Sequence, residues 1–358
     1  MNLCFIENIE TDAFEEMHSL KNLDLSENHI ENITVGTFDT LIDLEELNLF
    51  NNYIKDIPVD LFKYNIKLKK LNIGDNLLLW INIGVFDNLE YLTTLVLSNN
   101  YISGNYWDSD VFRRNINIMN IQFSGNNMTE APNNLLTYFV KLISINLRDC
   151  HLKEFPKFLI SSNLTNIIVL NLRNNEIRII EQNHFDNFEI LSILDLSANQ
   201  IEYIAENSFK RMRKLTFLNL SKNLLTTIPN KLFATTYKLS LLDLSYNMII
   251  YLQEDLFKRT NLKNLNIAHN RLTYLQQNFC QQQRNNGAFI KNFYFNHNPW
   301  QCACLRDLLD EVKELRIKYN STYFDGGQPV CVTTEEFVCK RQENLNSFYA
   351  DLFDSTVH

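Results

Sequence analysis

The sequence predicts an α/β solenoid, in which short coils stack along one axis and each contributes one strand to a parallel sheet. Two observations support this fold class. An apolar triplet spelled L-x-x-L-x-L, followed by Asn, returns every 23 to 28 residues along the 358-residue chain. The chain also holds only 8 Gly and 6 Pro with 45% apolar residues, which excludes collagen and Pro/Gly-rich disorder. A stack of ordered coils therefore explains the length.

The repeat is clearest in the segment LKNLDLSENHI, where Leu20, Leu23 and Leu25 precede Asn28. The same Asn position returns eleven times, with Cys150 in place of Asn once: at Asn52, Asn76, Asn100, Asn126, Cys150, Asn175, Asn199, Asn223, Asn247, Asn270 and Asn298. This spacing is typical of repeats that form one supersecondary unit each. We expect the array to cover residues 1–298.

Each position of the unit has a physical role. The last two Leu point inward along a short strand, and the residues beside them face solvent on the concave side. The Asn amide can satisfy turn backbone groups of neighbouring coils. A second apolar column, ten residues after the Asn position, fills the irregular convex side: Phe14, Phe38, Phe62, Phe86, Leu136, Ile160, Phe185, Phe209, Phe233 and Phe257, with Phe112 and Phe279 slightly out of step. A curved horseshoe is the expected shape.

The start of the chain lies inside a repeat. Counting back 24 residues from Asn28 gives Cys4, so the strand of this first unit is missing. The segment MNLCFIENIE has neither the basic nor the apolar region of a signal peptide. We therefore expect a signal peptide and an N-terminal cap to precede residue 1. A run of 18 apolar residues occurs nowhere, so we expect no membrane-spanning helix.

The end of the array carries four of the seven cysteines, which predicts a small cap over residues 299–340 and a tail over residues 341–358. Between Cys304 and Cys331, one helical face is apolar, with Leu305, Leu308, Leu309, Val312 and Leu315. Asp307 early and Arg316 late suit the helix dipole. The four cysteines form either disulfides or a zinc site. Because C-x-C is not the usual zinc knuckle, we favour disulfides, for which three pairings are open.

The spelling L-x-x-L-x-L-x-x-N-x-I-x-x-I-x-x-x-x-F and the cysteine cap resemble the typical class of extracellular leucine-rich repeat proteins. Toll-type receptor ectodomains and the arthropod leucine-rich immune molecules belong to this class. The resemblance implies bridges Cys302–Cys331 and Cys304–Cys339. It also implies a recognition scaffold in innate immunity, with a cell-adhesion or guidance receptor ectodomain as the alternative.

Modification signals agree weakly with a secreted or extracellular location. N-glycosylation sequons occur at Asn32, Asn127, Asn163 and Asn320, outside the strands. The repeat consensus itself generates the sequon at Asn219, which therefore carries little weight. We interpret Cys4, Cys150 and Cys280 as buried inert thiols. The alternative is an exposed Cys4 that pairs with a residue upstream of residue 1 or with another chain.

We find no catalytic or cofactor motif: no G-x-S-x-G, H-E-x-x-H or G-x-G-x-x-G occurs. We therefore predict neither an enzyme nor a cofactor or metal centre. The formal net charge of −9 makes nucleic acid a poor partner. His269 and His297 occupy one position in adjacent units. We interpret them as solvated residues rather than as a metal or pH-sensitive contact.

The concave face is the expected binding surface for a protein or another macromolecular ligand. The first residue of four consecutive strands is apolar, at Val169, Ile193, Phe217 and Leu241, and contiguous exposed apolar surface marks partner sites. The alternative is that these residues only pack against their neighbours. Arg148, Arg173 and Tyr246 would rim the surface. A second candidate is the loop carrying Tyr106 and Trp107, whose alternative is a self-packed insertion. A homo- or heterodimer is possible.

Overall fold

The computed structural model describes residues 1–324, 330–333 and 337–357. The chain divides into two compact units, Met1–Asn175 and Glu176–His358. Within the described residues, every helix is too short or too polar to cross a membrane. The units are described in turn.

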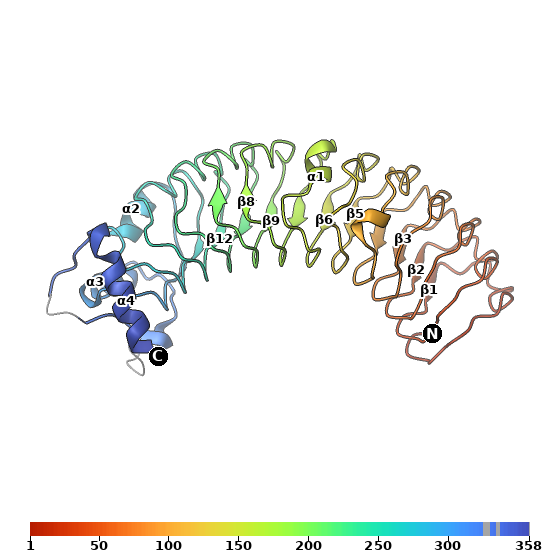
Figure 1. Cartoon of the computed structure of the whole chain (residues 1–358), viewed down its shortest axis with the longest axis horizontal. Helices are drawn as coiled ribbons and strands as arrows, with labels where there is room; N and C mark the ends of the chain where they lie inside the picture. The colour runs from red at the N-terminus through yellow and green to blue at the C-terminus, as the bar shows by residue number, and fades with distance from the viewer. Residues whose placement is uncertain (325–329, 334–336, 358) are drawn as a thin grey trace. The chain divides into compact units, whose positions relative to one another are not determined.

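The first unit is a stack of coils whose strands form a parallel sheet (Figure 1). Each strand has three residues and pairs in register with the next along the chain: β1 (Asn22–Asp24), β2 (Glu46–Asn48), β3 (Lys70–Asn72), β4 (Thr94–Val96), β5 (Asn120–Gln122), β6 (Ser144–Asn146) and β7 (Val169–Asn171). The middle residue of every strand is buried and its neighbours face outward, as the repeat predicts. A 3-10 helix, η1 (Gly104–Tyr106), and a short helix, α1 (Lys157–Ser161), lie in the connections.

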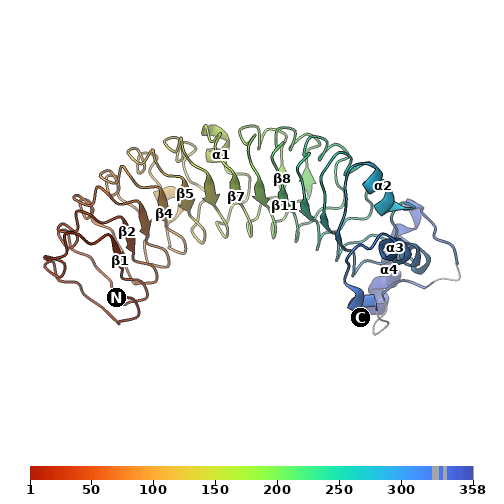
Figure 2. The same ribbon diagram turned by 180° about the vertical axis from the view of Figure 1, so that it is seen from behind.

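The second unit continues the same design and ends in the cap (Figure 2). Its parallel strands are β9 (Ile193–Asp195), β11 (Phe217–Asn219), β12 (Leu241–Asp243), β13 (Asn264–Asn266) and β14 (Asn292–Tyr294). Two further strands, β8 (Ile179–Ile180) and β10 (Tyr203–Ile204), pair with each other in a separate small sheet. The helices are α2 (Phe279–Asn285), α3 (Cys302–Glu314) and α4 (Asn346–Val357), with 3-10 turns η2 (Ser321–Phe324) and η3 (Glu343–Leu345).

The expected phenylalanine column is confirmed as the second half of the core. Phe38 and Phe62 stack with ring centroids 6.4 Å apart, and Phe86 stacks on Phe112 at 6.1 Å although Phe112 is out of step. In the second unit, Phe233 stacks on Phe257 at 5.9 Å. All six rings are buried. The rings fill the side of each coil that has no sheet to cover it.

The asparagine ladder is also confirmed. The Asn52 amide donates to the carbonyl oxygens of Leu25 in the preceding coil and Leu49 in its own, at 3.0 and 3.1 Å. Its Oδ1 accepts the N–H of Ile30 at 3.1 Å. One buried carboxamide thus satisfies backbone groups of two coils that water cannot reach.

Cys150 interrupts this ladder, and the next asparagine compensates. The Cys150 Sγ lies 3.5 Å from the Phe123 carbonyl oxygen, a weak contact. Asn175 Oδ1 accepts two N–H groups, those of Cys150 and Leu152, each at 3.0 Å. Asn28 accepts the N–H groups of Cys4 and Ile6 in the same way. Cys4 therefore occupies the position in the first coil that the ladder asparagine occupies in the others. The thiol of Cys4 is nevertheless exposed, so the expectation of a buried group is wrong there.

The cap has the predicted disulfides, Cys302–Cys331 and Cys304–Cys339. Leu305, Leu308 and Val312 of α3 are buried, as the apolar face predicts. The charges at its ends differ from the expectation, because α3 already begins at Cys302 and ends at Glu314. Asp307 therefore lies in its second turn and Arg316 lies beyond its end.

Residues after the cap fold back onto the second unit. Asn346, at the start of α4, accepts a hydrogen bond from Thr273 Oγ1 at 2.5 Å, and Tyr349 and Ala350 are buried. Arg271 pairs with Asp354 at 3.4 Å. The tail is therefore a docked helix.

Candidate functional site

The four predicted apolar residues each occupy the first position of a strand, on the side of the sheet that faces solvent. In the second unit, Phe217 lies in direct register between Ile193 and Leu241. Ile193 is 39% exposed, and Phe217 and Leu241 are half-buried. These three residues form the apolar strip. Val169 starts β7 in the first unit, where its register partner is Ser144.

The last residue of each strand, an Asp or Asn in most coils, has a structural role that the sequence did not reveal. Asp195 Oδ1 accepts both the N–H and the hydroxyl of Ser197, at 2.9 and 2.6 Å. Asn146 and Asn171 accept the N–H groups two residues on, at 3.1 and 3.0 Å. These side chains cap the turn after the strand, so this row is not free to vary.

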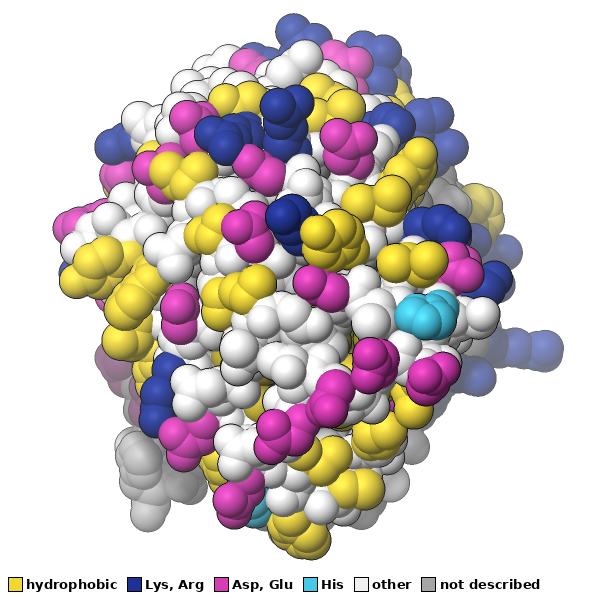
Figure 3. Space-filling model, turned by 90° about the vertical axis from the view of Figure 1, so that its right-hand side faces the viewer, with side chains coloured by type: hydrophobic (Ala, Val, Ile, Leu, Met, Phe, Trp, Pro, Cys, Tyr) yellow, Lys and Arg dark blue, Asp and Glu magenta, His cyan; other side chains and the backbone are white. Residues whose placement is uncertain are grey.

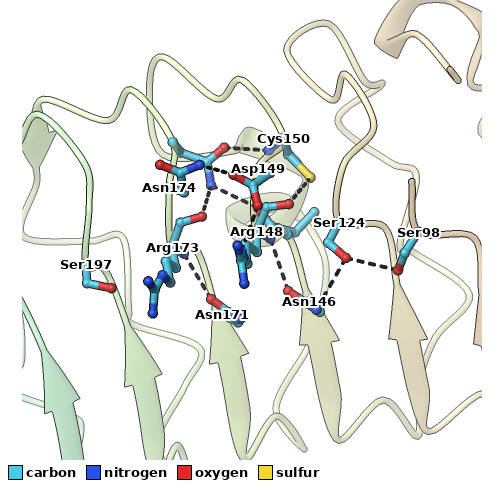
Figure 4. A network of polar contacts seen from close by, with 12 residues as sticks. Ser98, Ser124, Asn146, Arg148, Asp149, Cys150, Asn171, Arg173, Asn174 and Ser197 are labelled. Carbon is cyan, nitrogen blue, oxygen red and sulfur yellow. Dashed lines mark hydrogen bonds and ion pairs between the residues drawn. The ribbon is translucent and has the colours of Figure 1, made fainter. Parts of the chain in front are cut away.

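Arg148 and Arg173 occupy the turn position whose backbone N–H donates to the last strand residue. Other coils have small residues there, among them Ser98, Ser124, Ser197, Ser221 and Ser245. The two arginines follow β6 and β7, whose strands are paired, and the Asp149 N–H donates to the Arg173 carbonyl oxygen at 3.1 Å. Figure 4 shows both side chains extending in the same direction from neighbouring coils. We name these residues the arginine pair.

The arginine pair is only partly neutralised. Arg148 Nε donates to Asp149 Oδ2 at 2.7 Å, and Asn174 donates to the other carboxylate oxygen (Figure 4). The Arg173 guanidinium makes no side-chain contact of this kind within the described part of the chain. Arg148 therefore has a carboxylate partner, whereas Arg173 is available to bind an anionic group.

Tyr246 belongs to an aromatic column in the second unit. Its ring stacks on His269 at 4.0 Å, His269 stacks on His297 at 4.0 Å, and His297 contacts Tyr323 at 4.2 Å. The two histidines are half-buried, so the expectation of solvated side chains is wrong. Burial, together with His297, lowers the pKa of His269 to about 4, and burial lowers the pKa of His297.

The structure exposes only one of the two aromatic rings of the second predicted site, Tyr106 and Trp107. The Trp107 ring is buried against Phe112 and Phe123, at centroid distances of 6.1 and 5.2 Å. Tyr106 is 59% exposed. The expectation that both rings lie in a binding loop is therefore wrong for Trp107, which packs into the core of its coil.

The predicted modification positions are accessible. Asn32, Asn127, Asn163 and Asn320 are all exposed. Asn219 is half-buried on the concave face, where its Oδ1 accepts the Ser221 N–H at 3.0 Å.

The two buried free cysteines are not reactive. Burial raises the pKa of the Cys150 thiol to about 12 and also raises that of Cys280, so neither is poised as a nucleophile.

The first coil exposes apolar side chains of its own, Leu3 and Phe5. Figure 3 faces the N-terminal end and shows apolar side chains interspersed with acidic ones. This end lacks a continuous apolar surface comparable to the in-register strip.

A family model for the leucine-rich repeat matches residues 2–54, 42–102, 141–201, 165–225, 190–249 and 213–272, together more than half of the chain. None of the curated protein sequences compared with the chain matches it.

Solved structures share the fold at low sequence identity. A leucine-rich repeat protein of Leptospira interrogans, LIC12759, is 19% identical with a TM-score of 0.75, covering 88% of this chain and 81% of that one. The LRIM1/APL1C complex gives 22% identity and a TM-score of 0.68, with coverages of 98% and 65%. Toll, in the Drosophila Toll–Spatzle complex, gives 21% identity and a TM-score of 0.66, with coverages of 94% and 53%.

Proposed function

The chain belongs to the leucine-rich repeat family, and on that premise we propose that it is a non-catalytic extracellular recognition protein. Its ligand is a macromolecule, in the first place a protein, which binds the solvent-facing side of the sheet. Innate immune recognition is the process to which we assign it.

The apolar strip carries this proposal. Three large apolar side chains in register on the outer side of a sheet are unnecessary for the core, because the middle residue of each strand already fills it. An apolar centre with an aromatic side chain in the same unit is a composition that protein interfaces favour. Tyr246 in the same unit is a further proposed contact. In the first unit, Val169 and the arginine pair are proposed as ligand-binding residues in their own right.

The assignment to the extracellular space has separate support. The two disulfides persist in oxidising compartments. The four exposed sequons are suited to glycans. Toll is solved with Spatzle and LRIM1 with APL1C, so structural neighbours of this chain form protein complexes.

The test immobilises the native chain and its variants and compares how much ligand each captures from extracellular fluid of the source organism. Phe217→Asp should abolish capture of the ligand, because it places an unpaired charge at the centre of a desolvated contact. Ile193→Asp, at a more exposed position, should do the same with less risk to folding. Tyr237→Asp, at an exposed position outside the strand, is the matched control.

Folded Phe217→Asp and Ile193→Asp proteins that capture as much ligand as the native chain would overturn the proposal. Full glycan occupancy at Asn219 would also contradict it, because a glycan there would cover the apolar strip.

A further inference from the structure

A second site lies beside the cap, away from the apolar strip. We propose that Arg284, Lys291, Arg316 and Lys318 form a pocket that binds the sulfate groups of an extracellular sulfated polysaccharide. We name it the basic pocket. The inference goes beyond the concave-face function and is independent of it.

The pocket is a defined cavity of about 410 Å³. Arg284 lies in the last turn of α2, Lys291 precedes β14, and Arg316 and Lys318 follow α3. Backbone bonds fix this arrangement: Lys318 N–H donates to the Lys291 carbonyl oxygen at 2.9 Å, and the Lys318 carbonyl oxygen accepts the Phe293 N–H at 2.8 Å. Lys318 is thereby paired with Asn292, the residue after Lys291, so the two lysines lie on neighbouring segments of the backbone, one residue out of register.

The next coil extends the positive charge. Lys291 N–H donates to the Lys263 carbonyl oxygen at 2.8 Å, so Lys263 stands beside Lys291 on the preceding coil. Lys263 does not line the pocket, so it adds positive charge outside the cavity, beside Lys291. Cations inside and outside the cavity suit a linear chain with repeated anionic groups better than a single small anion.

The charges in the basic pocket are uncompensated. None of its four cations forms an ion pair within the described ranges of the chain. Glu311 of α3 accepts the Gln281 N–H and lines a separate cavity with Asp307 and Arg341. Glu314, the acidic residue closest in sequence, does not line the basic pocket.

Several lysines of the first unit have carboxylate partners, unlike those of the basic pocket. In the first unit, Lys55, Lys67, Lys69 and Lys70 each pair with a carboxylate at 2.6 to 2.8 Å. Four unpaired cations within one cavity, in a chain of formal net charge −9, concentrate a local positive field. An anionic ligand relieves that repulsion.

The aromatic lining favours a sugar over an acidic peptide. Phe289 borders the cavity, is 53% exposed, and lies 5.7 Å from the Arg284 guanidinium carbon. An exposed ring offers an apolar face to the C–H side of a pyranose, while the surrounding cations bind its sulfates. The volume suits a unit of one or two sugars.

The test uses immobilised heparin and two quadruple variants of equal charge. The pocket variant carries Arg284→Gln, Lys291→Gln, Arg316→Gln and Lys318→Gln; the control carries Lys55→Gln, Lys67→Gln, Lys69→Gln and Lys70→Gln. The native chain and the control should bind at physiological salt, and the pocket variant should lose at least tenfold in affinity. Because all eight side chains are exposed, both variants should keep the native thermal midpoint.

Two competitors separate sulfate recognition from general attraction to anions. Soluble heparin should displace the native chain, whereas fully desulfated heparin and polyglutamate should not. Displacement by polyglutamate as effective as by heparin would assign the pocket to an acidic protein segment and overturn the proposal. Equal losses in the two quadruple variants, or a native chain that does not bind heparin, would overturn it as well. Phe217→Asp should retain heparin binding, which separates this site from the concave face.

Discussion

At the scale of single residues, stability depends on carboxamides that bond to two coils at once. Most ladder asparagines accept one N–H from the neighbouring coil, as Asn223 does from Ile201. Asn175 accepts two because Cys150 cannot take the role of an asparagine. The cost of removing a ladder side chain should therefore follow the number of N–H groups it leaves unpaired.

We predict that Asn175→Ala lowers the free energy of unfolding more than Asn223→Ala. An orphaned buried N–H group costs about 1–3 kcal/mol, and Asn175→Ala orphans two where Asn223→Ala orphans one. Denaturant unfolding followed by circular dichroism measures both values. Arg173→Ala, whose side chain is exposed, should change stability by less than about 0.5 kcal/mol. Equal losses for the two asparagines would refute the compensation at Cys150.

The histidine stack predicts a pH dependence of stability. The pKa of His269 is about 4 in the folded chain and about 6.5 when unfolded, so the unfolded state binds more protons between these values. The contribution of His269 to the free energy of unfolding is therefore complete above pH 6.5 and declines as the pH falls toward 4. His269→Phe, which keeps a ring between Tyr246 and His297, should show a smaller drop in Tm between pH 7.5 and pH 5 than the native chain. An unchanged drop would contradict the assignment.

The arginine pair predicts an electrostatic contribution to ligand capture. Replacing Arg148 and Arg173 with Ser, the residue that several other coils use there, should leave the fold intact. Capture of the concave-face ligand should weaken several-fold, and its dependence on salt should become shallower, because charges at an interface rim act mainly on association. Capture measured at three salt concentrations tests this, and an unaltered salt dependence would remove the pair from the site.

At the scale of elements, the sequence predicted the strands and the core columns because both follow from spacing. The pairing of the cap cysteines came from the resemblance to extracellular leucine-rich repeat proteins, since the sequence itself left three pairings open. A buried Leu every second residue and a Phe every coil are local patterns that repetition makes visible. The His269 and His297 stack and the burial of Trp107 depend on side-chain directions between coils, which spacing does not encode. Helix α4 was missed because its few apolar residues acquire a burying surface only once the preceding coils have folded.

The disulfides should hold the cap together. Each bridge closes a loop of about 30 residues and should contribute roughly 3–4 kcal/mol by restricting the unfolded chain. Non-reducing peptide mapping should recover Cys302–Cys331 and Cys304–Cys339. Joint replacement of Cys304 and Cys339 by Ser should lower Tm. Free thiols at these four positions, or bound zinc, would contradict the pairing.

At the scale of the whole molecule, the chain combines a stable repeated framework with two exposed surfaces that the framework does not require. The sequence predicted the apolar strip, because apolar residues replace polar ones at the first position of successive strands, and it placed the arginine pair at the strand ends. It did not locate the basic pocket, whose cations come from three separate segments that only the folded cap brings together. Recognition at the concave face is therefore the central claim.

Photo-crosslinking from inside the apolar strip tests that claim most directly. Benzoylphenylalanine would replace Phe217 in one protein and Tyr237, exposed outside the strand, in another, and both would be irradiated in extracellular fluid of the source organism. The account predicts one discrete covalent adduct from position 217 that unlabelled native chain competes away, and none from position 237. No adduct at 217, or the same adducts from both positions, would contradict binding at the concave face.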